Sequence, residues 1–158
     1  MEQIASALLI WIAMNSAYPA AGLRPPPIVL LEPAAMAALA RGESFDGASQ
    51  SPPTADANIW GHYRWDAGPS GTIYIVRPED TAGAARYAQP SDNPVFRERL
   101  LHELVHFAQR QTGAYERFLC RAQGEHDAYR LGGRYLHEQG VGDPLPNRRF
   151  VAFVQSSC

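Results

Sequence analysis

The stretch that most constrains this 158-residue chain is residues 101–106, which read L-H-E-L-V-H. Histidines four residues apart lie one turn apart on the same face of an α-helix, so His102 and His106 can reach one metal ion. Glu103 lies beside that face, where its carboxylate can contact a water at the metal without being a ligand itself. Because the motif has this meaning only on a helix, the fold has to provide one here.

The sequence around the motif has the signals of such a helix. Residues 91–94 are Ser-Asp-Asn-Pro, which supplies capping side chains followed by proline at the first helical position. Thr112-Gly113 marks the end, because glycine suits the left-handed position after a helix. We predict a helix over about 94–111 at the centre of a small domain, since its apolar residues fall on more than one side. These residues are Val95, Phe96, Leu100, Leu101, Leu104, Val105, Phe107 and Ala108.

A metal centre on this helix needs a third protein ligand. The variant of the motif with three histidines would have glycine at 109 and histidine at 112, but this chain has Gln109 and Thr112. We therefore expect a carboxylate from the next predicted helix, roughly 119–138.

Two carboxylates of that second helix compete for the role. Glu125 and Asp127 are two residues apart, so they point to nearly opposite sides of a helix. Glu125 shares its face with small and apolar residues that allow close helix packing, whereas Asp127 shares its side with Arg130 and Arg134. We predict Glu125 as the ligand, with Asp127 and then His126 as the alternatives.

The two motifs together resemble known proteins. H-E-x-x-H followed by Glu125-x-x-Ala128-Tyr129 is similar to the gluzincin pattern of zinc metallopeptidases, in which a glutamate on a downstream helix completes a two-histidine site. The chain also resembles a family of small bacterial domains of unassigned function, whose last motif is usually E-x-E-A-Y-R, so Asp127 is a departure. The resemblance implies one α+β zincin-like domain over 1–158, with an active-site helix, a second ligand-bearing helix and a short β-sheet or hairpin. The segments that carry it are Trp11-Ile12, Tyr18, Gly71-Thr72-Ile73-Tyr74, H-E-L-V-H and E-x-D-A-Y-R.

We therefore expect a zinc-dependent hydrolase, a metallopeptidase that acts on a peptide or protein substrate. His102, His106 and Glu125 would bind Zn²⁺ and leave one position open for water. Glu103 would be the general base. The alternative is a non-catalytic zinc-binding domain, although a structural site has no need of an acid at position 103. Candidate donors to the oxyanion are Tyr129, which we place first, and Tyr74, His126 and His137.

The remaining elements follow from apolar runs and breakers. Residues 4–14 form an apolar run that is too short to span a bilayer, and we favour a buried first helix within 1–18 over a signal segment. A short buried strand over 28–31, a helix over 33–40 and a loop over 43–58 come next. Segments 59–65 and 72–76 predict a hairpin. In zinc peptidases an edge strand pairs with extended substrate, but we expect 72–76 to be an ordinary strand under the helix.

Composition limits the partners and the compartment only in part. A net charge of −2 gives no reason to expect nucleic acid or an anionic membrane, and we expect no membrane span. The only cysteines are Cys120 and Cys158, which would either form a disulfide or remain separate thiols. The protein could be cytoplasmic or exported, and a disulfide would favour export.

Overall fold

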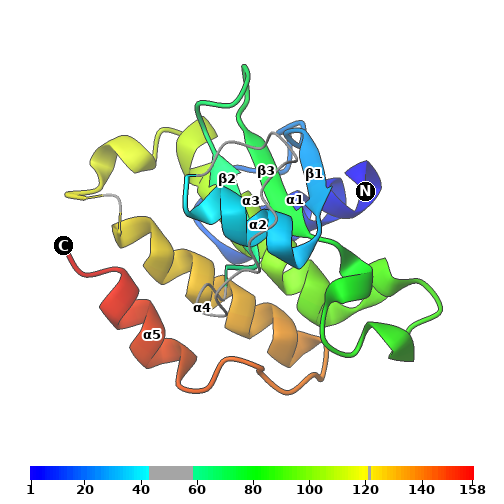
Figure 1. Ribbon diagram of the computed structural model, residues 1–158. Coiled ribbons are helices and arrows are strands. Elements are labelled where there is room, and N and C mark those ends of the chain that lie inside the picture. The colour runs from blue at the N-terminus through cyan, green and yellow to red at the C-terminus, as the bar shows by residue number, and fades with distance from the viewer. Residues whose placement is uncertain (43–58, 121) are drawn as a thin grey trace.

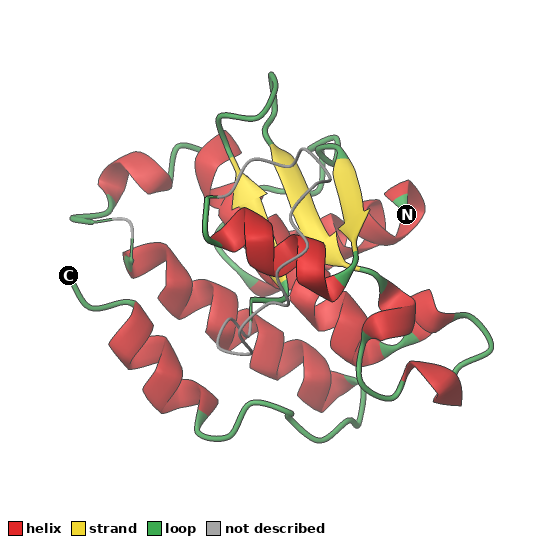
Figure 2. Cartoon of the chain, viewed as in Figure 1, coloured by secondary structure: helices red, strands yellow, loops and turns green. Residues whose placement is uncertain are grey.

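The computed structural model describes residues 1–42, 59–120 and 122–158, and this part of the chain forms five α-helices and one three-stranded sheet (Figure 2). The predicted α+β class is confirmed. The predicted loop over 43–58 lies outside the described residues. The elements are α1 (Glu2–Asn15), β1 (Ile28–Leu31), α2 (Pro33–Ala40), β2 (Gly61–Arg64), β3 (Thr72–Val76), α3 (Pro94–Gln111), α4 (Gln123–Glu138) and α5 (Arg148–Gln155).

The sheet has the strand order β1-β3-β2, with β1 parallel and β2 antiparallel to β3. The predicted hairpin is therefore confirmed, and β3 is the central strand with a neighbour on each side. Its turn needs glycine, because Gly71 has φ +74° and a Cβ there would lie 2.8 Å from the carbonyl oxygen of Arg64. The prediction that 28–31 is a buried strand was wrong in one respect. β1 forms a sheet edge, which leaves Val29 and Leu30 more than a third exposed.

Helix α3 is the centre of the domain, as predicted. It packs against the sheet, α1 and α4, while α2 lies on the other side of the sheet in Figure 1. Its bounds agree with the predicted 94–111, because Asn93 caps the first turn by accepting a hydrogen bond from the Val95 N–H at 3.0 Å. The last turn ends at Gly113, which has φ +68°. Seven of its apolar side chains are buried: Phe96, Leu100, Leu101, Leu104, Val105, Phe107 and Ala108.

The N-terminal helix and the C-terminal helix cover α3 and α4. The helix predicted within 1–18 is confirmed as α1, which buries Leu8, Leu9 and Ile12 in the core. At the other end of the chain α5 packs along α4 (Figure 1). In the described part of the chain, no helix is both long and apolar enough to cross a membrane.

A disulfide joins Cys120 to Cys158, with 5.9 Å between their Cα atoms. Of the two alternatives for these cysteines, the structure has the bonded pair. The bond connects the segment before α4 to the last residue of the chain, so the α4–α5 pair is closed covalently. The predicted start of α4 near 119 was wrong: α4 begins at Gln123, because the 3₁₀ turn at 115–117 is followed by extended backbone at Phe118.

Candidate metal centre

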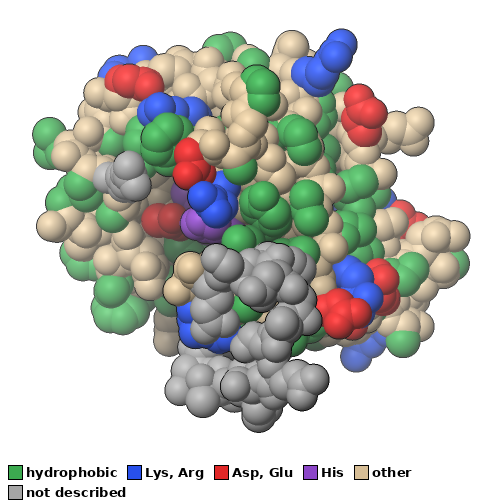
Figure 3. All heavy atoms as spheres, turned by 45° about the horizontal axis from the view of Figure 1, so that its top comes forward, with side chains coloured by type: hydrophobic (Ala, Val, Ile, Leu, Met, Phe, Trp, Pro, Cys, Tyr) green, Lys and Arg blue, Asp and Glu red, His purple; other side chains and the backbone are tan. Residues whose placement is uncertain are grey.

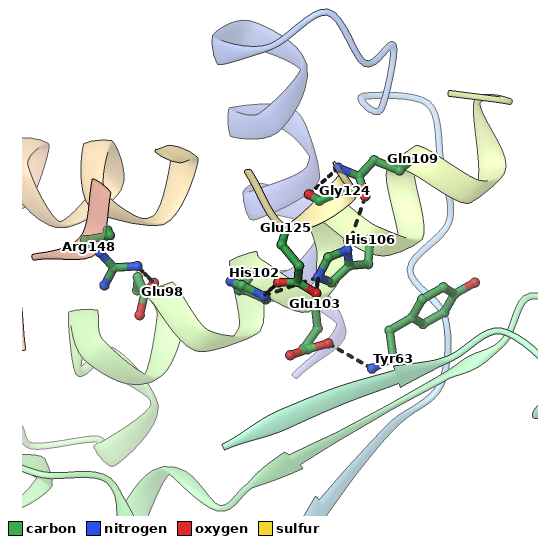
Figure 4. A network of polar contacts seen from close by, with 9 residues as sticks. All are labelled: Tyr63, Glu98, His102, Glu103, His106, Gln109, Gly124, Glu125 and Arg148. Atoms are coloured by element: carbon green, nitrogen blue, oxygen red, sulfur yellow. Dashed lines mark hydrogen bonds and ion pairs between the residues drawn. The ribbon is translucent and has the colours of Figure 1, made fainter. Parts of the chain in front are cut away.

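Three side chains from two helices converge between α3 and α4. His102 and His106 project from one face of α3, and Glu125 reaches them from the first turn of α4 (Figure 4). The Nε2 atoms of His102 and His106 are 3.2 Å apart. The Glu125 carboxylate lies 3.1 Å from Nε2 of His102 and 3.3 Å from Nε2 of His106. The structure thus brings together the three predicted ligands.

The separations suit a small tetrahedral metal ion. Zinc with nitrogen and oxygen ligands at about 2.0–2.1 Å holds those atoms about 3.3–3.4 Å apart. The three observed separations of 3.1–3.3 Å are close to this requirement. Two imidazoles and a carboxylate are also a common donor set of catalytic zinc sites, with a fourth position left for water. The residues present therefore fit a bound Zn²⁺.

The orientation of His106 is fixed by Gln109, which is completely buried. The Gln109 amide nitrogen donates to the carbonyl oxygen of Gly124 at 2.9 Å, so its amide oxygen is the atom that faces Nδ1 of His106 at 3.1 Å. Nδ1 must then carry a proton, and Nε2 is left for the metal. Partners of this kind orient metal ligands and raise their basicity. Gly124 is required, because a Cβ there would lie 2.7 Å from the Gln109 amide oxygen.

The alternative ligands have other partners. Asp127 accepts a hydrogen bond from the Tyr18 hydroxyl at 2.6 Å and one from Arg130 at 3.3 Å. Its predicted neighbour Arg134 pairs instead with Glu138 at 2.8 Å, one turn further along α4. The side chain of His126 is 59% exposed and lies near Asp127 rather than in the cluster. Neither alternative belongs to the three-residue group.

The charges of the cluster depend on one another. Burial alone would lower the pKa of His106, but hydrogen bonding and attraction from Glu125 raise this pKa to about 9. Burial opposes ionisation of Glu125, yet its bonds to His102 and His106 hold the pKa of this carboxyl well below its usual range. Without a metal, a proton shared with the carboxylate therefore sits where the ion would bind. A metal has to displace that proton.

Glu103 lies beside the cluster and faces β2. One carboxylate oxygen accepts a hydrogen bond from the Tyr63 N–H at 2.8 Å (Figure 4). The other side of the carboxylate packs on Gly61, where a Cβ would lie 2.7 Å from Oε1. Glu103 is 7% exposed, and Figure 4 shows its carboxylate pointing towards Tyr63 of β2 and not joining the three-residue group. The strand backbone therefore holds this acid in place.

Tyr129 is the predicted oxyanion donor that lines the same cleft. It is one turn after Glu125 on α4, and its ring packs edge-on against His102, with 4.8 Å between the ring centres. Burial, and then the charge of Glu125, raise the pKa of the Tyr129 hydroxyl, so it remains a donor at neutral pH. The other three predicted candidates, Tyr74, His126 and His137, are not among the described residues that line the cleft.

The cleft has a volume of about 1400 Å³ and runs between β2, α3, α4 and the segment before α5. Figure 3 shows histidine side chains set back in a hollow, beside acidic and basic side chains. One wall contains Arg148, whose buried guanidinium binds Glu98 at 2.7 Å and Asp143 at 2.6 Å. The sequence did not predict the contacts of Arg148 with Glu98 and Asp143. It also did not predict a role for Gln109, which was considered only as the position where the three-histidine motif would have glycine.

The fold and the cluster define the class of this protein: a small α+β domain that carries a His-His-Glu group capable of holding a metal ion. All of it, residues 1–158, matches one family model, described as Domain of unknown function (DUF6647), and the chain belongs to this family. No curated protein and no solved structure matches the chain.

Proposed function

We propose that this protein is a zinc-dependent hydrolase of the zincin type that cleaves peptide bonds. The observation that carries the proposal is the convergence of His102, His106 and Glu125 next to an acid that is not part of the group. Zinc bound there would lower the pKa of a water towards ~7 and polarise the scissile carbonyl. The resemblance to gluzincins, drawn from the motifs alone, agrees with this arrangement.

The chain's own residues supply the proton transfers. Glu103 is the general base, which takes the proton of the attacking water and passes it to the leaving amine. Its hydrogen bond from Tyr63 and its packing on Gly61 keep the carboxylate in one orientation, which lowers the cost of aligning it. Tyr129 donates a hydrogen bond to the oxygen that becomes negative during attack.

The outer edge of β2, which no strand of the described residues pairs with, supports a peptide as substrate. The Trp60 carbonyl accepts a hydrogen bond from the Val76 N–H, so alternate residues of this strand bond to β3. Gly61 and Tyr63 are the residues between, and the Tyr63 N–H already points into the cleft towards Glu103. The backbone of Gly61 is then directed to the same side. An extended peptide can pair there with Gly61 and with the carbonyl oxygen of Tyr63, while the Tyr63 N–H stays bound to Glu103.

Zinc content tests the site. We expect one equivalent of zinc per chain by elemental analysis of protein purified without added metal. Glu125→Ala should lose most of it, whereas Asp127→Ala, on the same helix, should keep it. If the parent takes up no zinc even after reconstitution, the proposal is wrong.

Hydrolysis tests the base. Glu103→Gln has nearly the same shape, so it should keep zinc and lose hydrolysis of a broad peptide library by about a hundredfold to ten-thousandfold, because the general base is lost. Retained hydrolysis in this variant would sink the mechanism. A zinc-loaded parent that cleaves nothing would favour the alternative of a non-catalytic zinc-binding domain.

We also propose that the protein works in an oxidising compartment outside the cytoplasm. The bond between Cys120 and Cys158 supports this, because such disulfides persist where thiols are not kept reduced. Mass spectrometry of alkylated protein from its native cells should find no free thiol. A fully alkylated pair would contradict the proposal.

A further inference from the structure

Four arginine side chains line the cleft among the described residues, and one of them differs from the rest. Three have a carboxylate partner within 3.4 Å, whereas Arg99 has no ion pair with any described residue. The three pairs are Arg64 with Asp66, Arg110 with Glu116, and Arg148 with both Glu98 and Asp143.

Arg99 is held in an unusual environment. Its guanidinium carbon lies 3.7 Å from the centre of the Trp60 ring, so one face of the group is stacked on the indole. Its Nη1 atom is buried and has no hydrogen-bond acceptor in the described part of the chain. Burial lowers the pKa of Arg99 to about 10, while the charge of Glu98 opposes the change, so the group is still a cation at neutral pH. An unpaired buried donor is unfavourable and rare unless it has a role.

The neighbouring carboxylates are engaged elsewhere. Glu98, the residue before Arg99, binds Nη1 of Arg148. Glu103, one turn later, accepts its hydrogen bond from Tyr63. No described carboxylate therefore pairs with the positive charge of Arg99, in contrast to that of Arg148.

Arg99 is also placed close to the proposed reaction. Helix α3 runs beside β2 and the residue before it. Arg99 and Glu103, four residues apart on the helix, therefore contact neighbouring positions from Trp60 to Tyr63. Arg99 stacks on Trp60, and Glu103 contacts Gly61 and Tyr63. Four residues on a helix correspond to about 6 Å along its axis. A peptide along the outer edge of β2 that is cleaved near Glu103 would pass Arg99 within one or two residues of the cleaved bond.

We propose that Arg99, stacked on Trp60, is the subsite for an acidic group of the substrate, and that the protein acts on peptides with a carboxylate next to the cleaved bond. The inference rests on the proposed function. Because Nη1 is buried, the edge formed by Nε and Nη2 is the one that a carboxylate would meet, and two neighbouring N–H groups of a guanidinium match a carboxylate with two parallel hydrogen bonds. Binding a carboxylate neutralises the one cleft arginine that has no carboxylate partner among the described residues.

The test uses zinc-loaded protein and two small ligands of equal length. Glutaric acid monohydroxamate has a zinc-binding hydroxamate at one end and a carboxylate at the other, and its matched analogue has a terminal amide in place of the carboxylate. We expect calorimetry to give at least tenfold tighter binding for the acid. Arg99→Gln should reduce this preference to less than threefold, while Arg110→Gln, a change at another cleft arginine, should leave it intact.

The outcomes separate the two proposals. If neither hydroxamate binds, the bound zinc has no open position, so the proposed catalytic site is wrong and this inference is overturned with it. If both bind equally well to the parent, the metal site stands and the role of Arg99 is overturned. Should Arg99→Gln fail to fold, Arg99→Lys decides: it keeps the charge without the fork, and an undiminished preference would show that no fork is needed.

Discussion

Two polar clusters lie one turn apart along α3, and they use the same kinds of groups in opposite ways. In the first, Arg148 donates to Glu98 and Asp143, and every charge has a partner within the chain. In the second, the Nε2 atoms of His102 and His106 face each other at 3.2 Å, beside a carboxylate. Figure 4 shows the two side by side on the same helix.

The difference teaches what each cluster is for. The Arg148 cluster is complete and fastens α5 to the helices beneath it. The histidine cluster is complete only with an added cation, either a proton or a metal ion. Both depend on glycines of α4 that let the helices approach. A Cβ at Gly132 would collide with Glu98 and lie 3.0 Å from Arg148, just as one at Gly124 would meet Gln109.

The largest expected effect separates stability from metal binding. Arg148→Ala leaves Glu98 buried without its counter-charge, and removing one partner of a buried pair costs about 3–5 kcal/mol of unfolding free energy. Urea unfolding measures this loss, and zinc stoichiometry should stay at one per chain. The neighbouring Arg149 is exposed, so Arg149→Ala should change stability by no more than about 0.5 kcal/mol. Equal losses in the two variants would remove the distinction between the clusters.

The next prediction is that the stability of the metal-free protein and its affinity for zinc change in opposite directions with pH. The pKa of His106 is raised from its usual 6.5 to about 9 in the metal-free protein. The stability that this proton contributes is present below pH 6.5 and is lost as pH rises towards 9. Zinc competes with the same proton, so its affinity should rise over that interval, by up to about tenfold per pH unit.

Chelator competition and urea unfolding at pH 6.5, 7.5 and 8.5 measure the two trends. His126→Gln, which changes an exposed histidine outside the cluster, should alter neither. Two slopes of the same sign would mean that zinc does not displace the His106 proton.

A smaller effect tests the orientation of His106. Gln109→Ala removes the acceptor for Nδ1, and losing such a partner typically weakens metal binding 10–100-fold. Competition with a chelator at fixed pH measures the change, and the spectrum of the cobalt-substituted protein should show altered geometry. Gln139→Ala, at an exposed position after α4, is the control. An unchanged affinity in Gln109→Ala would leave the hydrogen bond without a function.

An effect of similar size concerns the proposed general base. In Gly61→Ala the new methyl group would lie 2.7 Å from Glu103, so this side chain must move by several tenths of an ångström. We expect kcat for peptide cleavage to fall roughly tenfold to a hundredfold, because misplacing a reacting group by about 1 Å costs about that much. Zinc content should not change. Gly22→Ala, where the methyl group meets open space, should keep full activity, and equal rates in both variants would refute this role of Gly61.

The sequence predicted those features of the fold and the site whose determining residues lie close together in the chain. The bounds of α3 follow from Asn93, Pro94 and Gly113, which are in or beside the helix, and they agree with the structure. The choice of Glu125 over Asp127 needed only the periodicity of α4. In contrast, the start of α4 was misplaced because residues 115–120, which lead to a disulfide with the last residue, have no comparable signal.

The supporting residues of the site were beyond reach for the same reason. Gln109 acts through Gly124 and Tyr18, and Tyr18 is 91 positions away in sequence. A polar residue on a buried helix face is a signal, but it does not identify the partner. An apolar run such as Ile28–Leu31 likewise predicts a strand without telling whether the strand lies inside the sheet or at its edge.

The bond between Cys120 and Cys158 makes a covalent ring of the final quarter of the chain. A single cut within this ring by a protease would release no fragment. The nicked molecule would keep its full mass on a denaturing gel until a thiol was added, and only then separate into two pieces. α5 would stay tied to the body of the protein, and with it the wall of the cleft that contains Arg148.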